Sequence, residues 1–307
     1  MRIRILGSAA GGGLPQWNCG CPNCRAARDG SPHVLPRTQS SVAISAEGRW
    51  WFLLNVSPDV RQQMMQFAEL GLTDNEPRGT SIAGCLLTDA EFDHTSGLLQ
   101  LREGCVFSIT STPLVRRWLN DFFPIGRLLS KIAERPWNEF SVDAADELTL
   151  PDGSSSGLTV RAFATGRDVP RFVPEPAETA AGSVVGLEIR DQATGGKLVY
   201  APCVPAIDQP LQESVKGADC VLVDGTFWSN DEPQQFGITD RTATDMGHLP
   251  VDGPNGSLAW LADLPVADRV YVHINNTNPM LDSTSGEHAE VTRLEIRVGA
   301  DGDEFVI

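Results

Sequence analysis

Three cysteines with the spacing of a metal site lie near the start of the chain: Cys19, Cys21 and Cys24. Thiolates in a C-x-C-x-x-C pattern can surround one tetrahedral ion, and their softness favours zinc, which has no redox chemistry and suits a structural role. The fourth ligand has to come from elsewhere. His33 is near in sequence, whereas Asn276 or His273 would have to be brought in by the fold. We therefore predict a structural zinc loop at 17–37.

A second group of potential ligands lies in a short acidic loop: Asp89, Glu91, Asp93 and His94. The loop follows the strand-like stretch GCLLT and precedes the helix-like stretch SGLLQL, so a solvated loop that caps a helix is the alternative interpretation. Two further polar residues, Asp224 and His273, end apolar runs in the same way. Because strand ends in layered α/β proteins converge on a crevice, we expect these residues to meet in space.

His248, in the sequence Met-Gly-His-Leu-Pro, is a candidate proton donor or acceptor, because histidine exchanges protons near neutral pH. A structural histidine with all its hydrogen bonds made is the alternative. The other four cysteines lie in apolar stretches, where small core residues are expected: Cys85, Cys105, Cys203 and Cys220.

The elements that would position these side chains are strands separated by helices. Strands are predicted at 2–7, 42–46, 50–56, 82–88, 105–110, 158–164, 184–190, 197–201, 219–224 and 269–275. Helices are predicted at 59–70, 96–102, 113–122, 206–216 and 256–264. This order indicates a layered α/β sandwich in one domain over residues 1–307, with a possible helical insertion at about 113–147.

Composition excludes several classes of function. The 307 residues have a formal net charge of −16, and a chain without basic runs is a poor match for nucleic acid or for an anionic membrane surface. No segment approaches the roughly 18 apolar residues that span a bilayer. Clustered cysteines in an odd total of seven argue against a disulfide framework, so we expect a protein of the reducing cytoplasm.

The motifs at the predicted strand ends resemble those of the metallo-β-lactamase superfamily. The resemblance rests on the opening ILGSAAGGG, the loop TDAEFDH, the later VDGTF and the terminal HINN. It implies an αββα sandwich of two mixed sheets flanked by helices. The positions that match metal ligands of the superfamily are Asp93, His94, Asp224 and His273.

The chain departs from the superfamily's H-x-H-x-D-H loop, because Asp89 and Glu91 stand where two histidines belong. A third histidine, expected after the strand at 158–164, is also missing. Two imidazoles and one or two carboxylates remain, which is the donor set of a non-haem Fe(II) site that activates O2 rather than of a dizinc hydrolase. Arg167 and Arg171 flank the missing histidine and could bind substrate carboxylates, with a solvated loop as the alternative.

The stretches WNCGCPNC, MGHLPV and HINNTNP narrow the resemblance to the PQQ synthesis B family over the whole chain. It implies a role in the biosynthesis of pyrroloquinoline quinone (PQQ), in which a Glu and a Tyr of a precursor peptide are crosslinked, excised and oxidised. The implied reaction is hydroxylation of the tyrosine-derived ring with Fe2+ and O2 as cosubstrate. Related members of the superfamily with the same cysteine motif complete their Zn2+ site with the residue three positions after the last active-site histidine, which implies Asn276 here. A soluble carrier of PQQ or its precursor toward the periplasm is the alternative, and a metal-dependent hydrolase is a third.

In this hypothesis His94 and His273 hold the iron with one or both of Asp93 and Asp224. Asp89 and Glu91 then act as bases toward the phenol or bind a second ion weakly, and His248 assists proton transfer. The expected partners are the small-molecule PQQ precursor, other PQQ biosynthesis proteins and, as an open alternative, a second copy of the chain in a homodimer.

Overall fold

Two seven-stranded sheets form the centre of the molecule, and their central strands are buried on both faces. The structure is a computed structural model that describes residues 1–71, 78–103, 105–132, 135–174 and 181–307. Along β3 (Trp51–Leu54), Phe52 packs between the two sheets, whereas Trp51 and Leu53 pack in an outer apolar layer. Successive strand residues point to opposite faces, so this unbroken apolar run covers both sides of its sheet.

The first sheet has the order β14-β1-β2-β3-β4-β5-β6. Its other strands are β1 (Arg2–Gly7), β2 (Ser41–Ser45), β4 (Ile82–Leu86), β5 (Ser108–Ser111), β6 (Trp137–Glu139) and β14 (Glu304–Val306). Strands β3 to β6 are parallel, while β1 pairs antiparallel with β2 and β14. The sheet is therefore mixed.

The second sheet has the order β13-β12-β11-β10-β9-β8-β7. Its strands are β7 (Ala145–Thr149), β8 (Ser155–Gly166), β9 (Val184–Asp191), β10 (Lys197–Ala201), β11 (Cys220–Asp224), β12 (Asp268–Val272) and β13 (Arg297–Val298). Strands β10 to β13 are parallel, and β7 to β10 are antiparallel. This sheet is also mixed.

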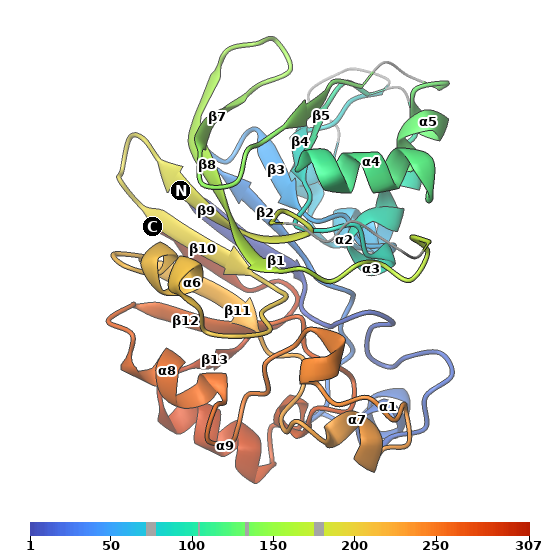
Figure 1. The fold of residues 1–307 in the computed structure, drawn as a ribbon, viewed down its shortest axis with the longest axis vertical. Helices are drawn as coiled ribbons and strands as arrows, with labels where there is room; N and C mark the ends of the chain where they lie inside the picture. Colours follow the sequence, from blue (N-terminus) through green and yellow to red (C-terminus); the bar gives the residue numbers. More distant parts are fainter. Residues whose placement is uncertain (72–77, 104, 133–134, 175–180) are drawn as a thin grey trace.

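Helices cover the outer face of each sheet (Figure 1). Those that pack on the first sheet include α2 (Val60–Gln66), α4 (Pro113–Asp121) and α5 (Ile125–Leu129). Those on the second sheet include α6 (Gln209–Ser214), α8 (Ser257–Asp263) and α9 (Gly286–Arg293). The predicted αββα sandwich of two mixed sheets is confirmed. No helix of the described residues is long and apolar enough to cross a membrane.

Shorter helices lie in the loops beside the strand ends. They are α1 (Pro22–Arg28), α3 (Phe92–Thr95), α7 (Glu232–Gln235) and the 3-10 turns η1 (Ala68–Leu70), η2 (Ser96–Leu99), η3 (Thr244–Met246) and η4 (Pro279–Leu281).

The segment at about 113–147 differs from the expected helical insertion. Only its first half is helical, and Trp118 of α4 packs in the outer core with Trp51. Its second half, apart from residues 133 and 134 outside the described ranges, supplies the edge strands β6 and β7. These two strands belong to different sheets, so the segment crosses the sandwich and is part of the fold.

Parallel pairing brings the carboxyl ends of three neighbouring strands to one edge. Asp224 ends β11, His273 directly follows β12, and Cys203 lies two residues after β10. From the first sheet, β4 leads into the loop that carries Asp89 and His94. The predicted convergence of polar strand ends is therefore present, and it extends to a strand end that the sequence motifs did not mark.

Candidate metal centre and active site

Two imidazole rings, those of His94 and His273, meet edge to face where the two sheets come together, with their centroids 5.0 Å apart. His94 lies in α3, and its Nδ1 is 2.7 Å from Oδ2 of Asp89. His273 has its Nδ1 2.8 Å from the Thr226 hydroxyl. These contacts fix the orientation of each ring and occupy Nδ1, so Nε2 is the nitrogen left for a further ligand on both histidines.

Asp93 lies beside both free nitrogens. Its Oδ2 is 3.3 Å from Nε2 of His273 and 3.8 Å from Nε2 of His94. Nε2 of His94 is buried and has no hydrogen-bond partner among the described residues. A buried imidazole nitrogen without a partner, next to a carboxylate and a second imidazole, fits a metal ion, and two histidines with one carboxylate form the donor set of non-haem Fe(II) sites.

A second cluster shares His273 and centres on Asp224. Its Oδ2 lies 2.7 Å from Nδ1 of His248 and accepts a hydrogen bond from the backbone N–H of Val204. Its Oδ1 accepts hydrogen bonds from the backbone and hydroxyl of Thr226. All four contacts fix the Asp224 carboxylate, which thereby orients His248. Asp224, His248 and His273 still offer three potential ligand atoms within 4.8 Å of one another.

Within the two clusters, burial and neighbouring charges shift the pKa of several groups away from their ordinary values. Burial opposes charge on His94, but the carboxylates of Asp89 and Asp93 outweigh it and raise its pKa to about 9. Burial also opposes ionisation of Asp93, yet His94 and His273 hold the pKa of that carboxyl well below its usual range. Burial, together with neighbouring His94, lowers the pKa of His273. A divalent cation would take the place of these protons, as metal binding in general does.

The two residues that replace histidines in the acidic loop have different surroundings. Asp89 is 2% exposed, and it also accepts hydrogen bonds from the Thr88 hydroxyl and the Glu91 backbone, so it orients His94. Glu91 lines the cavity, where burial and then the charges of Asp89 and Asp93 raise its pKa to about 7. A carboxyl with this pKa can exchange a proton at neutral pH.

A cavity of about 370 Å³ opens onto these clusters. Its wall includes the aromatic rings of Phe92 and Phe172, which stack with centroids 5.1 Å apart. Arg171 lines the cavity, and so does Arg241, which the sequence motifs did not single out. Arg167 is exposed and is not among the lining residues. The cavity thus combines an aromatic wall with two guanidinium groups, one of them predicted.

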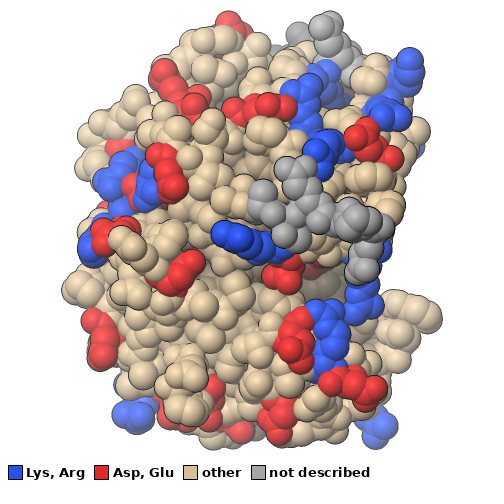
Figure 2. All heavy atoms as spheres, viewed as in Figure 1, with Lys and Arg blue, Asp and Glu red and all other residues tan. Residues whose placement is uncertain are grey.

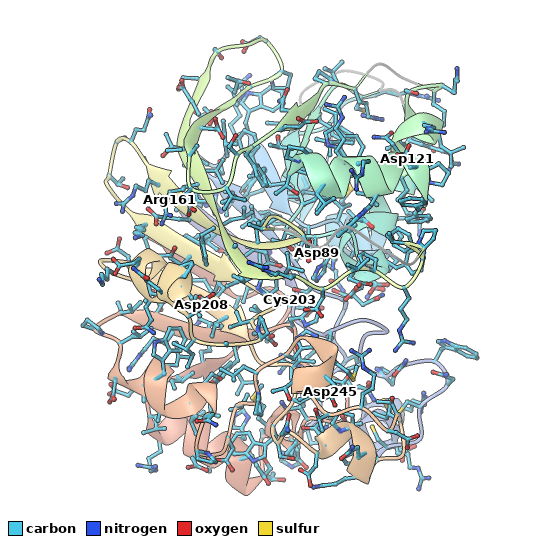
Figure 3. All side chains as sticks on the ribbon, viewed as in Figure 1. Asp89, Asp121, Arg161, Cys203, Asp208 and Asp245 are labelled. Carbon is cyan, nitrogen blue, oxygen red and sulfur yellow. The ribbon has the colours of Figure 1, made fainter. Side chains whose placement is uncertain are left out.

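Cys203 is a cavity residue, contrary to its expected place in the apolar core. It lines the same cavity, and its sulfur lies within 4.8 Å of a ring nitrogen of both His94 and His273. Figure 3 shows Cys203 and Asp89 near the centre of the molecule, between its two halves. The missed signal is the position of Cys203 just past the strand at 197–201. Two cysteines do pack in apolar clusters as expected: Cys85 and Cys220.

The three N-terminal cysteines gather at a separate site together with Asn276. The Nδ2 atom of Asn276 lies 3.1, 3.4 and 3.3 Å from the sulfurs of Cys19, Cys21 and Cys24. Burial, followed by the neighbouring thiols, raises the pKa of Cys24 to about 12, so a cation would be needed to hold three thiolates together. His33 is exposed and contacts Ser283 instead. The side-chain amide of Asn276 thus lies beside all three sulfurs.

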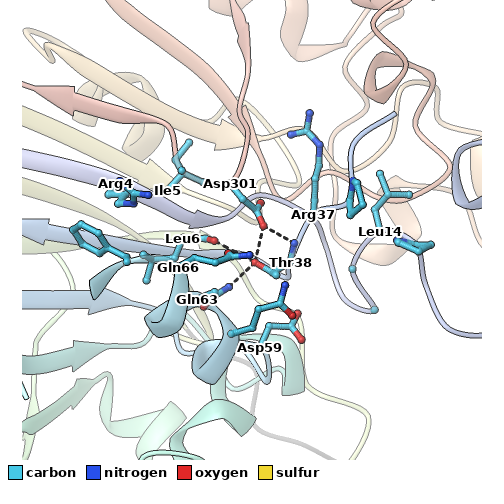
Figure 4. Close-up of a pocket in the computed structure, with 17 residues that line it drawn as sticks. Arg4, Ile5, Leu6, Leu14, Arg37, Thr38, Asp59, Gln63, Gln66 and Asp301 are labelled. Carbon is cyan, nitrogen blue, oxygen red and sulfur yellow. Dashed lines mark hydrogen bonds between the residues drawn. The ribbon is translucent and has the colours of Figure 1, made fainter. Parts of the chain in front are cut away.

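A larger cavity of about 520 Å³ lies beside α2 and is lined in part by Gly12 and Gly13 (Figure 4). No histidine or cysteine is among the 17 described residues that line it. Its carboxylate Asp301 accepts hydrogen bonds from the backbone and hydroxyl of Thr38, and Gln63 donates to that same hydroxyl. These polar groups satisfy one another's hydrogen bonds, and the described lining offers no histidine or cysteine for catalysis or metal binding. We therefore place the chemistry in the cavity of about 370 Å³.

Charges of both signs are interspersed over the face shown in Figure 2. The net charge of −16 therefore does not form one acidic surface on that face. Part of the excess of acidic residues lies inside the protein, because Asp89 and Asp224 are both almost fully buried.

Comparison with known proteins identifies the family. Residues 50–274 match the model of the beta-lactamase superfamily domain. Coenzyme PQQ synthesis protein B of Pseudomonas fluorescens strain Pf0-1 is 44% identical over 309 residues, which cover 100% of both chains. The chain belongs to the PQQ synthesis protein B family. A second member, from Pseudomonas putida strain KT2440, is 43% identical and covers 98% of both chains.

Solved structures agree with this family and with its fold. Zinc-bound PqqB from Methylobacterium extorquens superposes with a TM-score of 0.91 at 35% identity, over 100% of both chains. A diphosphatase of the PhnP family has a TM-score of 0.67 at 18% identity and covers 100% of this chain and 97% of its own. At that identity the second likeness concerns the fold alone, which is the metallo-β-lactamase fold.

Proposed function

We propose that the protein acts in PQQ biosynthesis as a metal-dependent enzyme whose centre is built on His94, His273 and Asp93. The observation that carries this proposal is the pair of Nε2 atoms beside one carboxylate, with each ring fixed through Nδ1. The names of the full-length relatives support the pathway. The solved relative is described as zinc-bound, which supports a metal but leaves its identity in the cell to experiment.

We infer that the metal is Fe(II) and that O2 is the cosubstrate. A site of two imidazoles and one carboxylate leaves coordination positions open, and bound Fe(II) would supply O2 activation there. The proposed reaction replaces a ring C–H of the tyrosine-derived part of the crosslinked Glu-Tyr precursor by C–OH. One oxygen atom of O2 enters the product and the other is reduced to water, which consumes two electrons from a reductant and two protons.

The residues around the centre have separate tasks in this proposal. Arg171 and Arg241 bind carboxylates of the precursor, which offsets the repulsion from the acidic loop. The aromatic wall at Phe172 packs against the ring that reacts. Glu91 accepts the phenolic proton, and His248, held by Asp224, transfers a further proton within the same cavity.

The N-terminal site is proposed to bind Zn2+ through Cys19, Cys21, Cys24 and the side-chain amide of Asn276. Half a turn of that amide exchanges its nitrogen and oxygen, and the oxygen is the atom that could bind a cation. Asn276 lies three residues after His273, so this zinc would brace the strand end that carries an active-site ligand.

Anaerobic reconstitution with Fe(II), followed by mass spectrometry of the crosslinked precursor after O2 and an excess of a two-electron reductant are admitted, tests the function. We expect the mass to rise by one or two oxygen atoms, and the oxygen to be labelled when 18O2 is used. A fully iron-loaded protein that leaves the precursor unchanged would refute hydroxylation. Tight binding of PQQ without turnover would favour the carrier, and cleavage of esters or phosphodiesters with Zn or Mn would favour the hydrolase.

A further inference from the structure

We propose that Cys203 is a sulfur ligand of the metal centre, which then has four protein donors: Asp93, His94, Cys203 and His273. This inference rests on the proposed metal centre and adds to it a soft donor. It changes the ligand chemistry from nitrogen and oxygen alone to a mixed site that includes a thiolate.

The first support is the position of Cys203 relative to the two histidines. Its sulfur and one ring nitrogen of each histidine all lie within 4.8 Å of one another. Nδ1 of His94 is already bound to Asp89, and its buried Nε2 has no partner among the described residues. A cation between the sulfur and this nitrogen would satisfy both atoms.

The second support is that apolar packing does not account for Cys203. Its neighbours Ala201 and Val204 belong to the apolar core of the second sheet, but Cys203 belongs to none of the three apolar clusters formed by the described residues. It lies partly accessible in the cavity wall. A cysteine that served only as a small core residue would be packed as Cys85 is, fully buried among apolar side chains.

The third support is that the backbone at Cys203 is fixed to the site. The N–H of Val204 donates to Oδ2 of Asp224 at 2.9 Å, and the same oxygen is 2.7 Å from Nδ1 of His248. This contact joins the end of β10 to the end of β11. Ligands held by such secondary contacts are already oriented before a metal binds.

Binding through Cys203 requires the thiol to lose its proton to solvent, because the thiolate is the metal ligand. Thiolate and carboxylate together would then neutralise a divalent cation between two neutral imidazoles. Such a site would bind borderline-soft ions such as Zn2+ and Co2+ well and would still accept Fe2+.

Cobalt replacement in the full-length protein tests this assignment. The three-cysteine site is first filled with one equivalent of zinc, one equivalent of Co(II) is then added, and X-ray absorption is recorded at both metal edges. We expect one sulfur per cobalt at about 2.3 Å and a thiolate-to-cobalt charge-transfer band. Both should be lost in Cys203→Ser and kept in the control Cys105→Ser, whose cysteine lines a different cavity.

The outcomes separate this inference from the metal centre on which it rests. Cobalt bound without any sulfur, or a sulfur signal unchanged in Cys203→Ser, overturns the role of Cys203 and leaves the centre of His94, His273 and Asp93 standing. No cobalt uptake beyond the three-cysteine site refutes the centre itself. If Cys203→Ser does not fold, the sulfur count at the cobalt edge of the unmodified protein still decides, because zinc occupies the other cysteines.

Discussion

The Thr226 hydroxyl is shared by three side chains of the site. It bonds to Asp224 at 2.6 Å and lies 2.8 Å from Nδ1 of His273 and 3.1 Å from Nδ1 of His248. We predict that Thr226→Val weakens binding of the active-site metal by about 10–100-fold, because the ring of His273 loses its orienting partner. Metal titration against a competing chelator measures this.

The matched control is Thr292→Val, at an exposed threonine of α9. It should leave metal affinity unchanged. Equal affinities for Thr226→Val and the native protein would show that the hydroxyl does not orient the ligand.

Glu232 gives the fold a pH dependence. This carboxyl is 2% exposed and accepts hydrogen bonds from Thr277 and the backbone of Trp228, and burial raises its pKa to about 7 from 4.5. The folded state therefore holds the proton more tightly than the unfolded state. Its stabilising contribution is present below about pH 4.5 and is lost as the pH rises through about 7, which amounts to about 3 kcal/mol.

Glu232→Gln keeps the shape of the neutral acid and cannot ionise. We expect urea unfolding to show that the native protein loses stability between about pH 5 and pH 8 relative to this variant. Glu290→Gln, at an exposed position of α9, serves as the control. Parallel stability curves for the native protein and Glu232→Gln would contradict the assignment.

At the residue scale, the sequence allowed the donors to be predicted but not their supports. Asp93, His94 and His273 follow apolar strands, and the C-x-C-x-x-C spacing is specific by itself. Thr226 and Cys203 have no such pattern, because their role depends on which strands become neighbours. Arg167 and Arg171 both flank the place of the missing histidine, yet of these two only Arg171 lines the cavity.

At the scale of elements, Gly97 holds the loop of His94 against the end of β3. The N–H of Gly97 donates to the carbonyl of Val56, whose own N–H donates to the carbonyl of His94. A Cβ on Gly97 would overlap the carbonyl oxygen of Ser57. We predict that Gly97→Ala costs about 1–3 kcal/mol or more and weakens the metal centre, because the loop must move.

Thermal unfolding and metal titration together test this close approach. Gly286→Ala is the control, because a Cβ there meets no atom within 4 Å. If both alanine variants are as stable as the native protein, Gly97 does not pack as closely against Val56 and Ser57 as the structure shows.

The three cysteines of the N-terminal loop connect that loop to the end of β12 through Asn276. Cys21→Ser should release zinc and destabilise the fold, because the binding energy of a structural metal contributes to folding. Zinc analysis and the free energy of unfolding check this. Full zinc retention with unchanged stability would show that the three cysteines are not a metal site.

The elements predicted from the sequence agree best with those of the structure where the apolar runs are long. The strands expected at 2–7 and 197–201 coincide with β1 and β10, and the helix expected at 113–122 with α4. The edge strands β6 and β7 were missed because they are short and largely exposed, so no apolar period marks them. The helix expected at 59–70 is interrupted at Phe67, which separates α2 from the 3-10 turn η1.

At the scale of the whole molecule, the two sites lie at opposite ends of one short segment that joins His273 to Asn276. Filling the active site should therefore stabilise the whole sandwich. At a free metal concentration of 100 times Kd, we expect a gain of about 2.7 kcal/mol if the unfolded chain does not bind the metal. Denaturant unfolding with the zinc site kept filled measures this, and no shift on adding the second metal would show that the folded protein does not bind it at the active site.

Element-resolved metal analysis of His94→Ala tests most directly whether His94 holds a metal that is distinct from the zinc at the three cysteines. The native protein and the exposed-histidine control His33→Ala should bind both metals. His94→Ala should lose the active-site metal and keep one zinc. Retention of both metals, or loss of both, would contradict this account.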